Sequence, residues 1–150
     1  MHTYFPQEFD HYSYGEGGRL KFLRIQTKSS ENTHQGYNDL LINTKGSSSP
    51  FAWIFEGEQK WSWVGRPEDL IEKNSWENYQ MAITFDSVSK NEGGMAEIRV
   101  WKNGVLLKHI TDRKTLEDPG SFAMRALLFT YWNGGGPEDQ SMYVLSLIHI

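Results

Sequence analysis

The segment EIRVW combines an acid, a cation and an indole at alternate positions. In an extended strand, residues two apart point to the same side, so Glu97, Arg99 and Trp101 would share one face. Ile98 and Val100 would point to the other side, into a core. An arginine can pair with a carboxylate of a ligand, and an indole can pack against the apolar face of a sugar ring. The segment therefore predicts a strand with a polar face suited to binding a uronate.

A second polar face is predicted on an earlier strand, LKFLRIQT. Strict alternation would place four side chains on each side of it: Leu20, Phe22, Arg24 and Gln26 on one, and Lys21, Leu23, Ile25 and Thr27 on the other. An arginine and a glutamine two residues apart can both hydrogen-bond to sugar hydroxyls. Arg24 and Gln26 are therefore candidate ligand-binding residues.

The rest of the chain consists of similar short segments separated by turns rich in Gly, Asn and Ser. Strands are indicated by GYNDLLIN, FAWIF, QKWSWVG, SWENYQMAITFDSV, MAEIRVW, GVLLKHI, RALLFTYWN and SMYV. Asn103-Gly104 predicts a tight hairpin turn. A second hairpin is predicted with its turn near Gly57, and Trp61 and Trp63 would share one face of the strand that follows this turn. Only RPEDLIEKNS could hold a helical turn. This pattern predicts an all-β antiparallel β-sandwich, as one domain spanning 1–150.

The composition narrows the classes of function. The net charge of -4 argues against a nucleic-acid partner, and no apolar run approaches the length of a membrane span. The chain has no cysteine, and its histidines have no partners at metal-ligand spacing, so neither thiolate chemistry nor a zinc site is predicted. No cofactor is predicted. Structural calcium remains possible, although no twelve-residue calcium loop is present.

Three segments together resemble a known family. They are GGRLKFLRI, then W-x-x-Y followed by MAEIRVWKNG, and finally LLFTYWNGGGPEDQSMYV. Their order resembles the jelly-roll polysaccharide lyases that act on alginate and glucuronan, within the concanavalin A-like lectin and glucanase superfamily. The resemblance implies a concanavalin-like jelly roll. It also implies that Thr130 or Tyr131 fills the place of a small polar residue of that family near the ligand, with Tyr143 as acid or base. Tyr131 and Trp132 are therefore candidate ligand-binding residues, and Trp61, Trp63 and Trp132 could line the same groove or belong to the core. Ser141 stands where that family has a further tyrosine.

A lyase would need a defined set of groups. Eliminative cleavage of a uronate chain removes the proton beside the carboxylate, so a cation must neutralise that carboxylate as charge develops. A tyrosine can supply the base or the acid when a nearby cation lowers its pKa. Arg99 and Tyr143 are the candidate catalytic residues. Six basic residues are predicted to lie in or beside one groove: Arg19, Lys21, Arg24, Lys28, Arg99 and Lys102.

Three functions from different classes remain open. The leading hypothesis is a carbohydrate-binding module with a polysaccharide or glycan partner, which needs only aromatic and hydrogen-bonding side chains on one face. The second is a lyase that cleaves an anionic uronate polymer by β-elimination. The third is a structural or adhesin domain of a larger protein, whose sign would be an apolar groove without convergent polar groups. An extracellular, cell-surface or virion-associated location is expected for all three.

The last six residues, 145–150, have an unusual explanation. LSLIHI can be encoded by a string that resembles the transposon mosaic end used in preparing sequencing libraries. The preceding segment also breaks off within the family-like pattern. We therefore expect that 145–150 are non-native, that the natural chain continues past Val144, and that His149 has no functional meaning.

Overall fold

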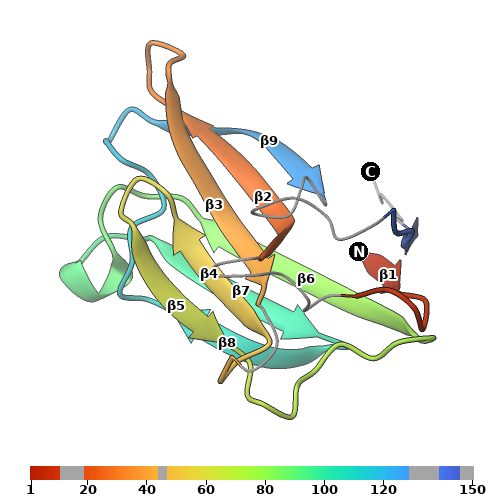
Figure 1. Ribbon diagram of the computed structural model, residues 1–150. Helices are drawn as coiled ribbons and strands as arrows, with labels where there is room; N and C mark the ends of the chain where they lie inside the picture. Colours follow the sequence, from red (N-terminus) through yellow and green to blue (C-terminus); the bar gives the residue numbers. More distant parts are fainter. Residues whose placement is uncertain (11–18, 44–46, 129–138, 146–150) are drawn as a thin grey trace.

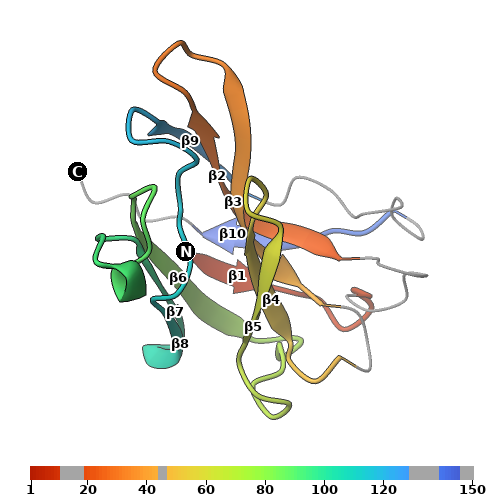
Figure 2. The same ribbon diagram turned by 90° about the vertical axis from the view of Figure 1, so that its left-hand side faces the viewer.

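In the described part of the chain, ten strands form two stacked antiparallel sheets (Figures 1 and 2). The computed structural model describes residues 1–10, 19–43, 47–128 and 139–145. Sheet A contains β1 (His2–Tyr4), β6 (Trp76–Thr84), β7 (Glu97–Lys102), β8 (Val105–Ile110) and β10 (Tyr143–Leu145). Sheet B contains β2 (Leu20–Lys28), β3 (His34–Ile42), β4 (Phe51–Phe55), β5 (Lys60–Val64) and β9 (Phe122–Leu128).

The strand order confirms the predicted all-β antiparallel β-sandwich. Sheet A runs β10-β1-β6-β7-β8, and sheet B runs β5-β4-β3-β2-β9. Within the described ranges the helical structure is a single 3-10 turn, Lys90–Glu92, and the segment RPEDLIEKNS contains no helix. No helix of the described chain is long and apolar enough to cross a membrane.

Both predicted hairpins are present. Asn103 and Gly104 have φ values of 50° and 80°, as required for the two central residues of the tight turn that matches the twist of paired strands. The β4–β5 turn closes when the backbone N–H groups of Glu58 and Gln59 donate to the Phe55 carbonyl, each at 3.0 Å. The pairing then places Trp61 opposite Ile54 and Trp63 opposite Ala52.

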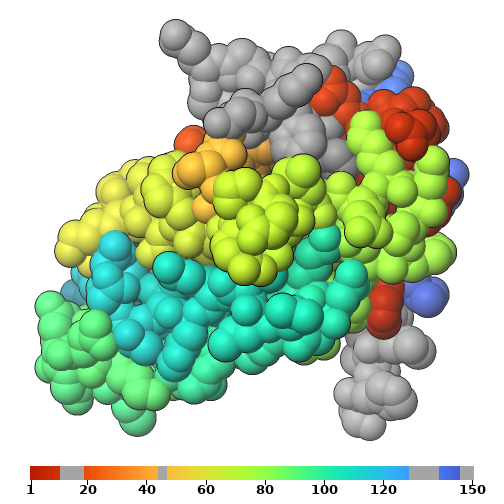
Figure 3. All heavy atoms as spheres, turned by 90° about the horizontal axis from the view of Figure 1, so that it is seen from below, coloured from red at the N-terminus to blue at the C-terminus, as the bar shows by residue number. Residues whose placement is uncertain are grey.

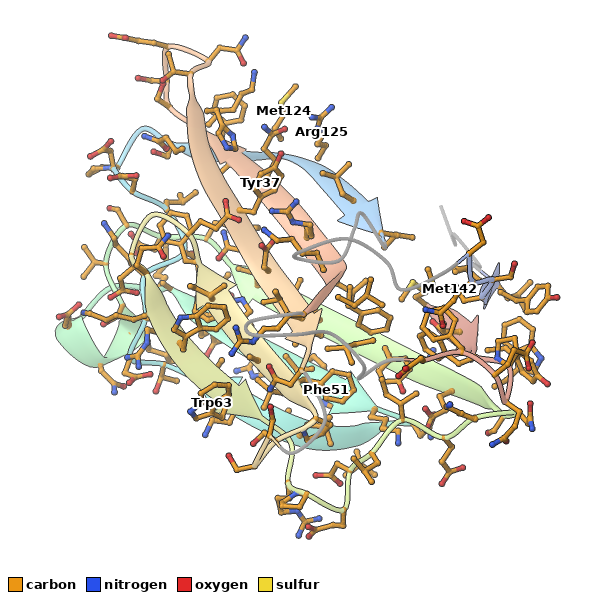
Figure 4. The ribbon with its side chains drawn as sticks, viewed as in Figure 1. Tyr37, Phe51, Trp63, Met124, Arg125 and Met142 are labelled. Atoms are coloured by element: carbon orange, nitrogen blue, oxygen red, sulfur yellow. The ribbon has the colours of Figure 1, made fainter. Side chains whose placement is uncertain are left out.

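The core lies between the sheets and is rich in aromatic rings. Phe22 and Phe51 of sheet B contact Tyr79 of sheet A with ring centroids 5.0 Å and 5.7 Å apart, both edge-on. Figure 4 labels Phe51 in this layer. Ile98 and Val100 are also fully buried here, which confirms the predicted inward face of EIRVW. Burying each large apolar side chain stabilises the fold by roughly 1.5–3 kcal/mol.

The two long sides of the sandwich differ. On one side β5 contacts β8, and Figure 3 shows these strands, yellow and teal, packed side by side. On the other side β9 pairs only with β2 among the described strands, and most of its residues are exposed.

The prediction of strict alternation along β2 was wrong at its start. The pairing with β3 shifts register between Lys21 and Leu23, which is a β-bulge. Phe22 and Leu23 therefore both enter the core, and Lys21 lies on the same outer face as Arg24. An extra residue in one strand reverses the alternation that follows it, and the sequence pattern alone does not reveal where such a residue falls.

Candidate functional site

The outer face of sheet B contains a polar hollow of about 210 Å³. Its floor includes Leu41 and Ile54, which are buried although they lie outside the core cluster. Charged and polar side chains from β2, β3 and the β4–β5 turn surround this floor, and an indole from β5 stands at one side. The hollow is lined by Lys21, Asp39, Leu41, Ile54, Glu56, Gln59 and Trp61.

Two cations and two acids form one network beside the hollow. Arg24 donates from Nε to Asp39 Oδ1 at 2.7 Å and from Nη2 to Asp39 Oδ2 at 3.1 Å. The same Nη2 atom donates to Glu56 Oε1 at 3.0 Å, and Lys21 Nζ lies 3.1 Å from that oxygen. The Arg24 guanidinium also lies 3.7 Å from the centre of the Tyr37 ring. Lys21 Nζ also lies 3.6 Å from Asp39 Oδ2. Each of the two acids therefore contacts both cations, and the formal charges of the four side chains cancel.

Burial dominates the electrostatics of this network. Asp39 is 1% exposed and Arg24 4% exposed. Burial raises the pKa of Asp39 to about 6, the nearby Glu56 carboxylate adds to the rise, and the hydrogen bond and charge of Arg24 oppose it. The site therefore holds a carboxyl group that can change protonation just below neutral pH.

Two indoles extend the hollow along β5. Trp61 and Trp63 have ring centroids 6.4 Å apart and ring planes only 17° apart. They are 38% and 47% exposed, as expected for side chains on the outer face of an edge strand. The Arg19 guanidinium lies 4.6 Å from the centre of the Trp61 ring and is oriented by Nε, which donates to Asn43 Oδ1 at 3.0 Å. Figure 4 shows Trp63 on β5.

Gln26 continues the outer face beyond Arg24. The side chain is 6% exposed, and its Nε2 lies 2.9 Å from His34 Nδ1. Its Oε1 atom has no hydrogen-bond partner within the described part of the chain. A buried amide oxygen without a partner is costly, so this atom can accept a hydrogen bond from a ligand or from water.

The EIRVW face lies on the opposite side of the sandwich, on sheet A. Glu97 Oε1 accepts from Arg99 at 2.8 Å, and its Oε2 accepts from Lys90 at 2.6 Å and lies 2.9 Å from His109 Nε2. The Lys90 hydrogen bond, then the His109 contact and the Arg99 charge, lower the pKa of Glu97 to about 2. Trp101 is half-buried on the same face, across from Leu106. Glu97, Arg99 and Trp101 do share a face, as predicted.

Tyr143 lies at the other end of sheet A. It is 56% exposed on β10, and its ring contacts Tyr4 of β1 at 5.9 Å. Tyr4 in turn pairs with Trp76, at the first residue of β6, whereas Arg99 pairs with Ala82 near its end. Tyr143 and Arg99 are thus separated by two intervening strands and by roughly 20 Å along β6. One uronate ring cannot contact both side chains.

The prediction that the basic residues line one groove was therefore wrong. Strand pairing places Lys21 and Arg24 on sheet B, and Arg19, just before β2, contacts Trp61 of the same sheet. Arg99 instead lies on the outer face of sheet A. Lys102, also from sheet A, pairs with the buried Glu77 at 2.7 Å. Local alternation predicts which residues share a face of one strand, but not which strands share a sheet. The six basic residues thus belong to two different sheets. Sheet B carries or adjoins Arg19, Lys21, Arg24 and Lys28, and sheet A carries Arg99 and Lys102.

Sequence reasoning missed three residues of the hollow: Asp39, Glu56 and Gln59. Asp39 carried a usable signal, because an acid within a strand, directly before the apolar run 40–42, is rarely buried unless a cation pairs with it. Glu56 and Gln59, in the β4–β5 turn, carried no comparable signal, because charged and polar residues are usual in turns. Tyr131 and Trp132 lie outside the described residues, as do 146–150. Across the part of the chain that is described, no group of three histidine or acidic side chains is placed to hold a metal ion.

No family model, curated protein or solved structure matches the chain.

Proposed function

We propose that this chain is a carbohydrate-binding module of the concanavalin-like jelly-roll kind, and that it binds a polysaccharide on the outer face of sheet B. The observation that carries the proposal is the pair of near-parallel, half-exposed indoles of Trp61 and Trp63 beside a polar hollow. A sugar ring has an apolar face of C–H groups and a rim of hydroxyls, so it needs an aromatic surface next to hydrogen-bonding groups. An extracellular, cell-surface or virion-associated location accompanies this proposal.

The charge pattern favours a neutral glycan over a uronate polymer. Lys21 and Arg24 already neutralise Asp39 and Glu56, so a uronate carboxylate would have to compete with two protein carboxylates for them. Sugar hydroxyls face no such competition, because they can donate to Asp39, Glu56 and Gln59 without breaking the ion pairs. The wide separation of Tyr143 from Arg99 also favours binding over eliminative cleavage.

The direct test is isothermal titration calorimetry with soluble neutral polysaccharides, such as xylan, glucomannan and mixed-linkage glucan, and with alginate and glucuronan. We expect binding to at least one neutral polymer. Trp61→Ala should weaken that affinity about tenfold, which corresponds to about 1.4 kcal/mol, because it removes the stacking surface. The matched control is Trp101→Ala, which removes a half-buried indole from the other sheet and should leave the affinity unchanged.

The opposite results are equally clear. Equal losses of affinity from Trp61→Ala and Trp101→Ala, or binding to none of the polymers by a folded sample, would contradict the proposal. Ultraviolet absorbance of an unsaturated product from alginate or glucuronan, abolished by Tyr143→Phe, would establish the lyase alternative instead.

A further inference from the structure

The cluster around Glu97 on the outer face of sheet A contains more positive than negative charge. Lys90 Nζ lies 2.6 Å and His109 Nε2 2.9 Å from Glu97 Oε2, and Arg99 Nη2 lies 2.8 Å from Glu97 Oε1. One carboxylate thus serves two cations and a histidine, whose charge depends on pH. The network on sheet B differs, because its two cations meet two acids. The cluster on sheet A therefore retains at least one positive charge that no acid within it balances.

The acids of the neighbouring loop are held by other donors. Asp86 accepts from the backbone N–H groups of Val88 at 3.1 Å and Met95 at 2.8 Å. Glu92 accepts from the Ser89 hydroxyl at 2.8 Å. Neither carboxylate forms an ion pair with the cluster in the described part of the chain, so the positive charge is not neutralised by contact with this loop.

Arg99 is placed to receive an anion. Its side chain is 39% exposed and lies between Ala82 on β6, which is too short to cover it, and His109 on β8. Among the described residues only its Nη2 atom has a partner, so its other N–H groups can donate to a carboxylate. The hydrogen bonds from Lys90 and His109, and the charge of Arg99, lower the pKa of Glu97 to about 2, so this position favours a carboxylate over a neutral acid.

An apolar surface lies beside the cluster. Trp101 follows Arg99 by two residues on the same face of β7 and is half-buried. Leu106 lies opposite Trp101 on β8 and is 49% exposed. Residues two apart in a strand are separated by about 7 Å, and an extended peptide has the same repeat. An acidic side chain and an apolar side chain two residues apart in such a peptide would therefore meet the cluster and the apolar surface together.

We propose that the outer face of sheet A binds an extended, acidic segment of a partner polypeptide, which lies along β7. An aspartate or glutamate of the segment contacts Arg99 and His109, and the apolar side chain two residues away packs on Trp101 and Leu106. The charge of the cluster selects an acid, and the exposed aliphatic side chain of Leu106 favours a polypeptide over a sugar. The proposal does not depend on the glycan site of sheet B. These residues and the loops beside them lie within the described range 47–128.

The test titrates a peptide with capped ends, Ser-Leu-Thr-Glu-Thr-Leu-Ser, into the protein and follows the indole N–H and histidine ring signals by NMR. A leucine two residues to either side of the glutamate satisfies the pattern in both directions along β7. We expect the signals of Trp101 and His109 to shift and saturate, while those of Trp61 and Trp63 stay in place. The same peptide with glutamine in place of glutamate should bind at least tenfold more weakly.

Two pairs of variants separate the charge from the apolar contact. Arg99→Met should weaken peptide binding at least tenfold, whereas Arg66→Met, at an arginine that is 72% exposed in the loop after β5, should leave it unchanged. Leu106→Ser should weaken binding at least threefold. Val105→Ser should not, because the neighbouring residue on β8 points to the other side of the sheet.

Four results would overturn the proposal. They are no peptide binding by a folded sample, equal affinities for the glutamate and glutamine peptides, shifts confined to sheet B, and an unchanged affinity in Arg99→Met. Alginate oligosaccharides serve as the competing ligand. If they shift Trp101 and His109 while the peptide does not, the outer face of sheet A binds an acidic glycan and not a polypeptide.

Discussion

The two outer faces of the sandwich use the same residue types to opposite effect. On sheet B, Arg24 pairs with Asp39, and both are almost fully buried. On sheet A, Arg99 pairs with Glu97, but the Arg99 side chain is 39% exposed. The pKa of Asp39 rises to about 6, and the pKa of Glu97 falls to about 2. An arginine beside an acid therefore does not define an electrostatic environment until its burial is known.

The two pairs differ mainly in the exposure of their cations. Asp39 and Glu97 are both largely buried, but Arg24 is buried with its acid, whereas Arg99 and Lys90 extend into solvent. Arg24 lies on the second strand from the edge of sheet B, against the Tyr37 ring, between Asp39 and Glu56. Glu97 instead collects hydrogen bonds from side chains that extend over solvent, including Lys90, whose side chain is 49% exposed. Desolvation opposes charge on sheet B, whereas charge-assisted hydrogen bonds favour it on sheet A.

The largest predicted effect concerns the two arginines. Arg24→Met should lower the free energy of unfolding by about 3–5 kcal/mol, because it leaves the Asp39 carboxyl group buried without its bidentate partner. Arg99→Met should cost less than about 1 kcal/mol, as is usual for an exposed ion pair. Urea denaturation measures both. The double variant Arg24→Met/Asp39→Leu should recover at least half of the loss; similar costs for the two arginine variants would contradict the comparison.

The pH dependence of stability should also separate the two faces. The pKa of Asp39 is raised, so its contribution makes the protein less stable as pH rises from 3.8 to about 6. The pKa of Glu97 is lowered, so its contribution is present above pH 4.5 and is lost as pH falls toward about 2. In urea midpoints measured against pH, Asp39→Asn should remove the first trend and Glu97→Gln the second. A single trend that responds to both variants would show that the faces are not independent.

Much of the fold could be predicted from local pattern. The alternation in EIRVW placed Ile98 and Val100 in the core, and Asn103-Gly104 marked its hairpin correctly. The β-bulge at Phe22 could not be predicted, because an inserted residue leaves no local signature when both of its neighbours are compatible with a strand. This error moved Lys21 to the wrong side of β2.

The candidate site was less accessible to sequence reasoning because it depends on pairing between distant segments. Arg24 and Arg99 each look like ligand-binding cations within their own strands. The strand order shows that they lie on opposite faces of the sandwich. The pairing of β2 with β3 places Asp39 opposite Arg24, so that the two form an ion pair. Such non-local pairings are set by the complete set of sheet contacts and not by any one segment.

The central claim is that a glycan binds over Trp61 and Trp63 on sheet B. The six tryptophans give six indole N–H signals that can be followed by NMR. The ligand to titrate is an oligosaccharide of the neutral polymer that binds in the calorimetric experiment. We predict that the Trp61 and Trp63 signals shift and saturate together, while those of Trp101 and the buried Trp53 stay in place. Shifts confined to Trp101, or to Trp76 beside Tyr4, would place the ligand on sheet A and contradict the account.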